Sequence, residues 1–302
     1  MLPASSLSVR VFYLNGGCAM VSSYIRNRTV LVTGSTDGIG LQTAIDLAKL
    51  GASVILHGRS EERLNRAMIQ LRQHDVQAVG AVVGDFAHFA SVRSMAAEIR
   101  DSFPELSVLV NNAGIYMNDH VLTQDGWETT WQVNHLAMML ITQELLFTLK
   151  EHRDARVVNV SSIAHTRGSI DFRNLNGEVQ YDGYPAYSQS KLANILFTYE
   201  LAERLHGSGI TANCLHPGVI GTKLLKAGFD MDGASLAEGA ETSVFLAADD
   251  SLADVSGKYF VRKQETASAQ ITYDAELRLK LWDLSLDMIN GKESGPISAT
   301  SR

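Results

Sequence analysis

The sequence predicts an α/β protein: a single doubly wound domain in which helices flank a parallel sheet of seven strands. Short, β-rich apolar runs alternate with longer amphipathic patterns along most of the 302 residues. The apolar runs lack the polar alternation of a half-exposed sheet, which is typical of parallel strands covered on both faces. Alternating strands and helices build βαβ units, so both observations lead to the same architecture.

Seven short apolar runs, bounded by Gly, Asn or Asp, are the candidate strands. In chain order they are Thr29–Thr33, Ser53–Leu56, Ala78–Val83, Val108–Val110, Arg156–Val160, Thr211–Leu215 and Tyr259–Val261.

Three helical patterns can be placed between or after these strands. The pattern at Leu41–Ala48 is followed by Gly51, a residue suited to the left-handed position just past a helix end. The pattern at Leu64–Leu71 follows Ser60, whose hydroxyl can cap a helix N-terminus. One more helix is expected near Asp274–Ile289.

The composition excludes several classes of protein. Hydrophobic residues make up 45% of the chain, which is enough for a sizeable core. The chain holds 26 Lys and Arg against 33 Asp and Glu, a net charge of −7, which argues against nucleic acid or an anionic membrane as a partner. Its two cysteines exclude a disulfide framework and fit a reducing, cytoplasmic compartment.

One domain is expected over residues 28–262, in which the Gly- and Ala-rich stretch 219–240 is interpreted as a mobile loop or lid. Residues 1–27 are expected to be a disordered extension, and Met20 is an alternative start. The apolar run Val11–Leu14 is too short for a signal peptide. Residues 263–302 are expected to be a tail with one helix. No apolar run reaches the ~18 residues of a membrane helix.

Residues 30–40 combine a strand, a tight turn and a helix start, with glycines at Gly34, Gly38 and Gly40. Gly34 permits the turn, Gly38 lets the backbone approach a pyrophosphate, and Gly40 lets the helix pack closely on the strand. The helix N-terminus offers unpaired N–H groups to phosphate. The pattern therefore predicts a dinucleotide-binding turn of the Rossmann type. The cofactor contacts expected here are Gly34, Ser35, Thr36, Asp37, Gly38, Ile39 and Gly40.

The end of the second strand bears on the choice between NADP and NAD. Folds that bind NAD usually carry a carboxylate here for the ribose 2′-hydroxyl. This chain has Gly58 followed by Arg59, whose guanidinium can pair with a 2′-phosphate. NADP(H) is therefore favoured. NAD(H) stays open because Asp37 and Glu61 lie nearby, and because Arg59 is alternatively a solvated surface residue.

Tyr187 and Lys191 form a Y-x-x-x-K pattern at the head of an apolar helical stretch. Residues four apart share a helix face, so the phenol and the ammonium point the same way. A free phenol has a pKa of about 10, too high for efficient proton exchange at neutral pH. A neighbouring Lys cation favours the phenolate, so the pattern predicts that Tyr187 is a general acid/base.

Taken together, the motifs resemble the short-chain dehydrogenases/reductases, in the branch of retinol dehydrogenases and WW-domain oxidoreductases. The similarity extends from about Thr29 to Val261. The motifs that carry it, in family order, are Thr33–Gly40, Asn111-Asn112-Ala113-Gly114, Ser161-Ser162, Tyr187 with Lys191, and Pro217-Gly218.

This resemblance implies a role for each matched residue. Ser162, rather than Ser161, is expected to hydrogen-bond the substrate oxygen. Tyr187 is expected to exchange the proton, and Lys191 to lower the pKa of Tyr187 and bind the nicotinamide ribose. Asn134 is expected to position a proton-relay water, with a packing amide as the alternative. Asn111 and Ala113 are expected on the adenosine side. The other implied cofactor contacts are Asp85, Phe86, Asn112, Gly114, Pro217, Gly218, Val219 and Thr222.

Other kinds of site are disfavoured by the pattern of residues. The nine histidines are scattered, and none forms a zinc-binding motif, so no metal site is expected. His165 follows Ser162 by three residues, but no nucleophile elbow surrounds the serine, which argues against a hydrolase. A catalytically silent nucleotide sensor or scaffold on the same fold remains the alternative to an enzyme. The complete set of Asn134, Ser162, Tyr187 and Lys191 favours the enzyme.

The substrate class is less well determined. The segment 219–240 should cover a small carbonyl or alcohol substrate, since ligands bind beyond the carboxyl ends of the strands. Its residues Leu224, Leu225 and Phe229 favour a lipophilic aldehyde or ketone, or a retinoid-like compound, whereas Lys223 and Lys226 would suit an acidic one. Members of the family often pair through the helices around Asn134 and Tyr187, so a homo-oligomer is also expected from the resemblance.

Overall fold

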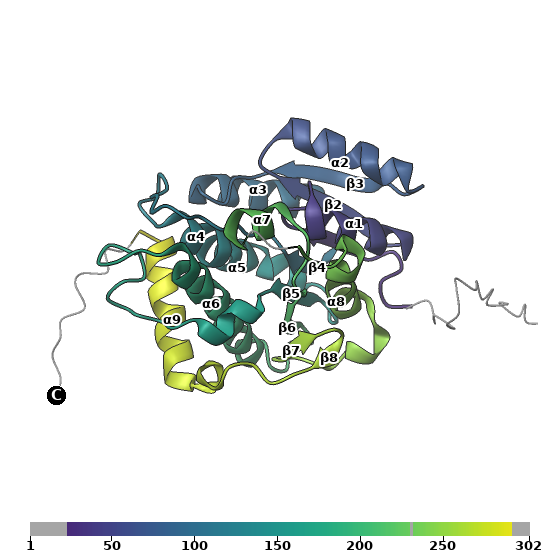
Figure 1. Ribbon diagram of the computed structural model, residues 1–302. Helices are drawn as coiled ribbons and strands as arrows, with labels where there is room; N and C mark the ends of the chain where they lie inside the picture. The colour runs from purple at the N-terminus through teal and green to yellow at the C-terminus, as the bar shows by residue number, and fades with distance from the viewer. Residues whose placement is uncertain (1–22, 230–231, 292–302) are drawn as a thin grey trace, which may run out of the picture.

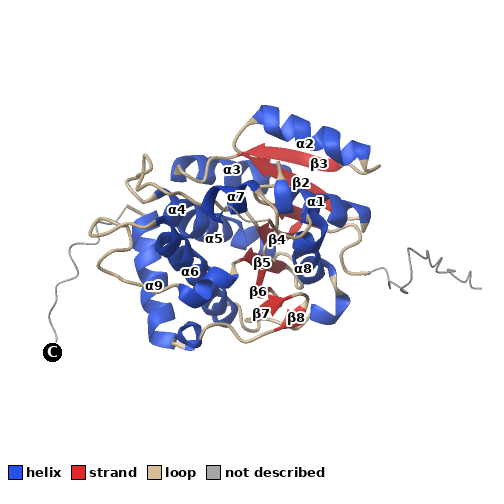
Figure 2. Cartoon of the chain, in the orientation of Figure 1, coloured by secondary structure: helices blue, strands red, loops and turns tan. Residues whose placement is uncertain are grey.

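The computed structural model describes residues 23–229 and 232–291, which form one sheet between two layers of helices (Figures 1 and 2). The strand order is β3-β2-β1-β4-β5-β6-β7-β8, and the first seven strands are parallel. Their bounds are β1 Thr29–Val32, β2 Ser53–Gly58, β3 Ala78–Val83, β4 Leu106–Asn111, β5 Arg156–Val160, β6 Thr211–His216, β7 Tyr259–Val261 and β8 Gln264–Glu265. The doubly wound α/β prediction is therefore confirmed.

The predicted count of seven strands misses β8, which pairs antiparallel with β7. β8 has only two residues, Gln264 and Glu265, both polar and exposed, so it has no apolar pattern. The turn before it places Arg262 and Lys263 at positive φ values of 51° and 65°. Hairpin turns of this kind normally show Asn or Gly at those positions, and this sequence lacks that signature.

Two apolar cores lie on opposite faces of the sheet. One is built with α1 (Gly38–Lys49), α2 (Glu61–Gln73) and α8 (Leu236–Ala248). The other is built with α3 (Phe89–Ser102), α5 (Ala137–Lys150), α6 (Gly183–Arg204) and α9 (Ala275–Ile289). Trp131, Met138 and Met139 are buried in this second core rather than in a ligand site.

The helix ends follow from the capping residues found in the sequence. Gly51 has a φ of 93° directly after the cap of α1, as its lack of a Cβ allows. The Ser60 hydroxyl accepts a hydrogen bond from the Arg63 N–H at 3.3 Å and begins α2. Asp274 caps α9 by accepting from the Leu277 N–H at 3.0 Å. The predicted roles of Gly51 and Ser60 are confirmed, and so is a helix near Asp274–Ile289, although its cap was not predicted.

The folded domain begins before residue 28. Ile25 is fully buried, and the ring of Tyr24 lies under the guanidinium of Arg156, 3.6 Å from its centroid. The Asp250 carboxylate accepts hydrogen bonds from the backbone N–H groups of Ser23 and Tyr24. The predicted extension over 1–27 is thus too long at its C-terminal end, because these contacts join residues over 100 positions apart. The rest of that prediction, and Met20, lie outside the described residues.

The segment 219–240 is more ordered than the loop that its composition suggested. It contains α7 (Lys223–Phe229), and its last five residues belong to α8. The Ser235 hydroxyl caps α8 by accepting from the Glu238 N–H at 3.2 Å. In the C-terminal tail, a 3-10 turn η4 (Gln270–Tyr273) precedes α9, which lies along α6 in Figure 1. Among the described helices, none combines the length and apolar character needed to span a membrane.

Candidate active site

A cavity of about 800 Å³ opens at the carboxyl ends of the central strands. Its walls come from the turns after β1, β2, β4, β5 and β6, together with α6 and α7. The neighbouring strands β1 and β4 are where the strand order reverses, which is where open α/β sheets bind ligands.

The glycine turn has the close approaches that its three glycines allow. Gly34 has a φ of 64°, and a Cβ there would lie 2.9 Å from the Cα of Ala113. A Cβ on Gly40 would overlap the carbonyl oxygen of Gly34 and the amide of Asn112. Gly38, with a φ of 59°, is uncrowded, since a Cβ there would make only an ordinary van der Waals contact with Thr222 at 3.8 Å. The turn therefore leaves room for an anionic group at the start of α1.

Two predicted contacts in this turn have other partners. Ser35 is fully buried and outside the cavity wall, and its hydroxyl accepts a hydrogen bond from the His57 N–H at 2.9 Å. Ser35 thus joins β2 to the turn, and its expected contact with the cofactor stays a prediction. Asp37 lines the cavity, caps α1 through the Gly38 N–H at 2.8 Å, and pairs with Lys223 of α7. This pairing lowers the pKa of Asp37.

His57 is a wall residue that the sequence reasoning missed. Its Nδ1 accepts from the Gly34 N–H at 3.0 Å, and its Nε2 donates to the Gly84 carbonyl at 3.0 Å. Burial lowers the pKa of His57 to about 4, so the ring is neutral. It stacks on Phe86 with 4.7 Å between centroids. The sequence signal that could have identified His57 is a polar residue directly after the apolar run Val54–Leu56.

The end of β2 places two guanidinium groups at one end of the cavity. Arg59 lines it as predicted, and so does Arg63, which the sequence reasoning did not single out. Both side chains are exposed. Arg63 lies four residues after Arg59, in the first turn of α2, and this spacing could have identified it from the sequence. Asp85 and Phe86 also line the cavity, with the Asp85 carboxylate accepting from the Ala87 N–H at 3.0 Å.

The turn after β4 contributes Asn112, Ala113 and Gly114 to the wall, as predicted. The Asn112 side chain donates to the Thr33 carbonyl at 2.9 Å and so joins this turn to the glycine turn. Asn111, by contrast, is buried within β4 and lies outside the wall. Its amide donates to Thr142 at 2.9 Å and to Asn159 at 2.8 Å. The expected adenosine contact of Asn111 is therefore wrong, because its strand position points the side chain at the α5 layer.

Ser162, Tyr187 and Lys191 all line the same cavity. Tyr187 and Lys191 are 7% and 3% exposed, and the Lys191 Nζ lies 5.6 Å from the centroid of the Tyr187 ring. Lys191 also donates to the Val160 carbonyl at 3.2 Å. The Ser162 hydroxyl accepts from the Ala164 N–H at 3.2 Å. The cavity thus brings together a hydroxyl, a phenol and an ammonium.

Burial, rather than the neighbouring ammonium, dominates the titration of this pair. It raises the pKa of Tyr187 to about 12, against a smaller lowering by the hydrogen bond with Ser162. It also lowers the pKa of Lys191 to about 8. The expected depression of the Tyr187 pKa is thus absent among the protein's own groups, because desolvation of the phenolate outweighs the hydrogen bond with Ser162.

Asn134 lies behind the cavity wall, on a π-helical turn η1 (Gln132–Leu136). Its amide oxygen accepts from the Ile115 N–H at 2.8 Å, and its nitrogen donates to the Ile115 carbonyl at 2.9 Å and to Ser190 at 3.0 Å. These contacts are the packing role that the sequence left open. They join the turn after β4 to α6, one residue before Lys191.

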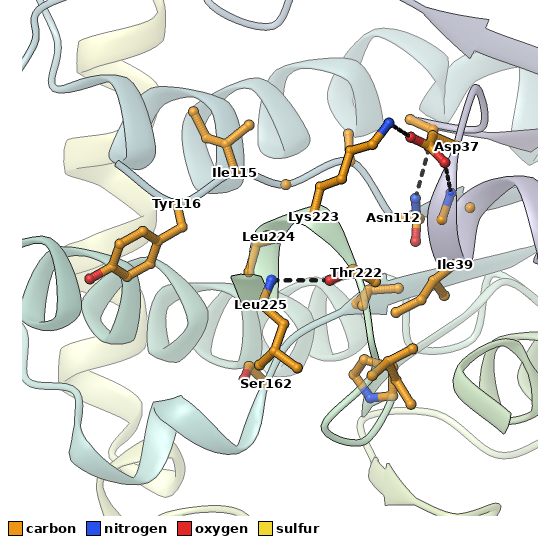
Figure 3. A pocket seen from close by; sticks show the side chains of 18 of the residues that line it. Asp37, Ile39, Asn112, Ile115, Tyr116, Ser162, Thr222, Lys223, Leu224 and Leu225 are labelled. Atoms are coloured by element: carbon orange, nitrogen blue, oxygen red, sulfur yellow. Dashed lines mark hydrogen bonds and ion pairs between the residues drawn. The ribbon is translucent and has the colours of Figure 1, made fainter. Parts of the chain in front are cut away.

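The opposite end of the cavity is apolar. Figure 3 shows Ile115 and Tyr116 across from Leu224 and Leu225 of α7, with Ser162 below them. Lys223 points away from this end and toward Asp37. Pro217, Gly218, Val219 and Thr222 connect β6 to α7 along the wall, as predicted, and His216 beside them has its pKa lowered to about 4 by burial. The remaining predicted wall residues, Thr36 and Ile39, also line the cavity.

Comparisons with known proteins agree with this geometry. The family model described as short chain dehydrogenase matches residues 28–232. Human retinol dehydrogenase 13 is 39% identical over 294 residues, which cover 92% of this chain and 89% of the relative.

Two solved structures share the fold. An uncharacterized protein from Mycobacterium paratuberculosis superposes with a TM-score of 0.75 at 32% identity, covering 89% of this chain and 96% of that one. A short chain dehydrogenase from Escherichia coli complexed with NADPH gives 0.67 at 25% identity, covering 80% and 98%. The chain is thus an oxidoreductase that belongs to the short-chain dehydrogenase family, in its retinol-dehydrogenase-like branch.

Proposed function

We propose that this protein is an NADP(H)-dependent oxidoreductase that interconverts a lipophilic aldehyde or ketone and its alcohol. The observation that supports this most strongly is one cavity with two chemically distinct ends. At one end Ser162, Tyr187 and Lys191 converge beneath an apolar wall. At the other end a glycine turn opens the start of α1 beside Arg59 and Arg63.

The residues present fit a nicotinamide dinucleotide. The turn at Gly34–Gly40 offers helix N–H groups and an uncrowded backbone at Gly38, which suits a pyrophosphate. Asp85, Phe86 and Lys191 also line the cavity. The proposal assigns Asp85 and Phe86 to the adenine and Lys191 to the ribose hydroxyls. When bound, the nicotinamide supplies hydride transfer, which no protein side chain can perform.

In the reductive direction, the chain's own groups handle the substrate oxygen. The Ser162 hydroxyl holds that oxygen, and the Tyr187 hydroxyl donates the proton to it. Burial raises the pKa of Tyr187 to about 12, so the phenol carries the proton at neutral pH but is a weaker acid than free phenol, and donation depends on a cation that stabilises the phenolate. The Lys191 ammonium, whose pKa of about 8 keeps it mostly charged at pH 7, then stabilises the phenolate that remains.

The preference for NADP rests on Arg59 and Arg63, two exposed guanidinium groups on the cavity wall. Both can pair with a 2′-phosphate, which NAD lacks. Glu61 and Glu62 lie in the same first turn of α2, so NAD is the alternative cofactor.

The lipophilic substrate rests on the apolar end of the cavity. Lys191 is the only Lys or Arg near Ser162 on the described wall, and it is buried beside Tyr187. Lys223 is paired with Asp37, and Lys226 is outside the wall. Neither is therefore placed to receive an acidic substrate. The named relatives are retinol dehydrogenases, which favours a retinoid-like or other long apolar aldehyde.

A screen of NADPH oxidation over aldehydes, ketones and quinones, repeated with Tyr187→Phe, tests the proposal. We expect turnover with apolar aldehydes, and a loss of at least about 100-fold in Tyr187→Phe because the proton donor is removed. NADPH binding should persist in the variant, measured by quenching of protein fluorescence. Undiminished turnover in Tyr187→Phe would refute the mechanism. NADPH binding without any turnover would favour the nucleotide-sensing alternative.

A further inference from the structure

His165 is fully buried on the 3-10 turn η2 (Ile163–Arg167), three residues after Ser162, and lies outside the cavity wall. Both of its ring nitrogens have backbone partners. Nδ1 donates to the Ser162 carbonyl at 2.7 Å, and Nε2 accepts from the Ala269 N–H at 3.1 Å. Since a carbonyl only accepts and an N–H only donates, the ring is held as one neutral tautomer.

The surroundings of His165 keep it neutral and fixed in orientation. Burial lowers its pKa, and the hydrogen bond with Ser162 opposes this less strongly. The Tyr259 ring meets it edge-on, with 5.0 Å between centroids. The backbone N–H of Gly168 donates to the His165 carbonyl at 3.0 Å and closes the turn. A ring held in this way fixes the position of the Ser162 carbonyl relative to the backbone of Ala269.

The partner on the far side, Ala269, belongs to the C-terminal segment 263–291, beyond the matched family region 28–232. This segment is itself anchored to α6. Ser268 bonds the Tyr199 hydroxyl at 2.8 Å and Thr272 at 2.6 Å. The Trp282 ring of α9 stacks on Phe197, with 5.4 Å between centroids. His165 therefore connects Ser162 to a well-anchored segment of the chain. Ala269, the partner in that segment, lies 104 residues after His165.

The same segment meets a second turn of the site. His135, next to Asn134 on η1, is buried, and its Nε2 lies 2.9 Å from the Ser285 hydroxyl of α9. The segment 263–291 thus contacts, through one imidazole each, the turn that carries Ser162 and the turn that carries Asn134.

We infer that His165 is a positioning residue, which sets the Ser162 hydroxyl in place by holding the Ser162 carbonyl against the C-terminal segment. This inference rests on the proposed function, because it presumes that Ser162 binds the reacting oxygen. The neighbouring bond from the Ser161 hydroxyl to the Lys191 carbonyl, at 2.7 Å, fixes the other side of the same turn to α6. Ser162 is thereby held from two directions.

A matched pair of substitutions separates positioning from packing. His165→Asn keeps an N–H where Nδ1 stands, and His165→Gln keeps only a polar atom where Nε2 stands. Both remove the ring and are expected to lower Tm similarly. We expect kcat within about threefold of wild type for His165→Asn. For His165→Gln we expect a fall of about 10- to 100-fold with unchanged KM for NADPH, since small misplacements at a reacting centre cost this much. Equal kcat values in the two variants would overturn the inference.

A double-mutant cycle with Ser162→Ala tests whether His165 acts through Ser162. His165→Gln should cost nothing further in the Ser162→Ala background, and a further fall of the same size would show that His165 does not act through Ser162. If Ser162→Ala alone keeps wild-type turnover, the proposed function itself fails, whatever His165 does.

Ala269→Pro tests the hydrogen bond from the Ala269 N–H to His165. It also replaces His165→Gln as the test if that variant does not fold. The φ of Ala269 is −56°, which proline adopts, so the change mainly removes the N–H that Nε2 accepts. We expect kcat to fall several-fold with NADPH affinity unchanged. Wild-type kcat in Ala269→Pro would show that the C-terminal segment does not position Ser162 through His165.

Discussion

Tyr187 and Lys191 lie one turn apart on α6, and burial favours the neutral form of each. It raises the pKa of Tyr187 to about 12 and lowers that of Lys191 to about 8. At pH 7 the phenol therefore keeps its proton, while the amine still carries most of its charge. The proton is thus available for donation, but the high pKa of Tyr187 makes it a weak acid, so in the proposed reaction the Lys191 ammonium must stabilise the phenolate that donation leaves.

Arg59 and Arg63 give a residue-scale prediction about the cofactor. We expect Arg59→Ala and Arg63→Ala each to lower kcat/KM for NADPH by about 10- to 100-fold, the size of a lost charge-assisted hydrogen bond. The value for NADH should hardly change, because NADH has no 2′-phosphate. Steady-state kinetics with both cofactors measures this.

Arg66 supplies the matched control for these substitutions. It lies on the same helix α2, pairs with Glu62 at 3.5 Å and is outside the cavity wall. Arg66→Ala should leave both kcat/KM values unchanged. Equal losses for NADPH and NADH in Arg59→Ala would contradict a role in recognising the 2′-phosphate.

Residues whose role depends on local spacing could be predicted from the sequence, and residues whose role depends on distant partners could not. Gly34 and Arg59 come just after the ends of β1 and β2, and Gly40 lies in the first turn of α1, so their positions could be predicted from local spacing. Ser35 and Asn111 were assigned to the cofactor, but Ser35 bonds His57 and Asn111 bonds Asn159. Such buried partners come from other strands, and no local pattern names them.

At the scale of elements, the ion pair between Lys223 of α7 and Asp37 of the glycine turn joins the two sides of the cavity (Figure 3). In the proposed binding mode Asp37 places a carboxylate beside the cofactor phosphates, and Lys223 offsets its charge. We expect Lys223→Ala to raise KM for NADPH by about 3- to 10-fold at low ionic strength. The effect should shrink with added salt, since the Lys223 side chain is 90% exposed.

The double variant tests whether Lys223 acts through Asp37. Asp37→Asn with Lys223→Ala should return KM for NADPH to near the wild-type value, because the unpaired carboxylate is gone. Lys226→Ala, on the same helix and outside the wall, is the control and should have no effect. If Lys223→Ala raises KM equally in the Asp37→Asn background, the charge-offset account is wrong.

Elements with clear ends were predicted well, and short elements were not. α1, α2 and α9 carry a capping residue or a terminal glycine, so their bounds follow from capping chemistry. α7 has seven residues within a Gly- and Ala-rich stretch, too few to show a helical period. β8 depends on pairing with β7 and has no apolar pattern of its own.

For the molecule as a whole, the two segments outside the predicted domain proved to be partly integral to it. Residues 23–27 pack through Ile25 and Tyr24, and the segment 263–291 packs on α6 and reaches the turn of Ser162. The net charge of −7 means that, in the proposed binding mode, an anionic cofactor would be held against the overall field by local groups. The start of α1, Arg59, Arg63 and Lys191 are those groups.

Transfer of deuterium tests the central claim most directly. The protein is incubated with NADPH carrying deuterium at the C4 position of its nicotinamide, in separate samples for each face, and with a long-chain apolar aldehyde. The account predicts an alcohol product labelled at the former carbonyl carbon from one of the two faces, and no labelled product from Tyr187→Phe beyond about 1% of the wild-type rate. Alcohol formed without label at that carbon from both deuterated cofactors, or labelled equally fast by Tyr187→Phe, would contradict it.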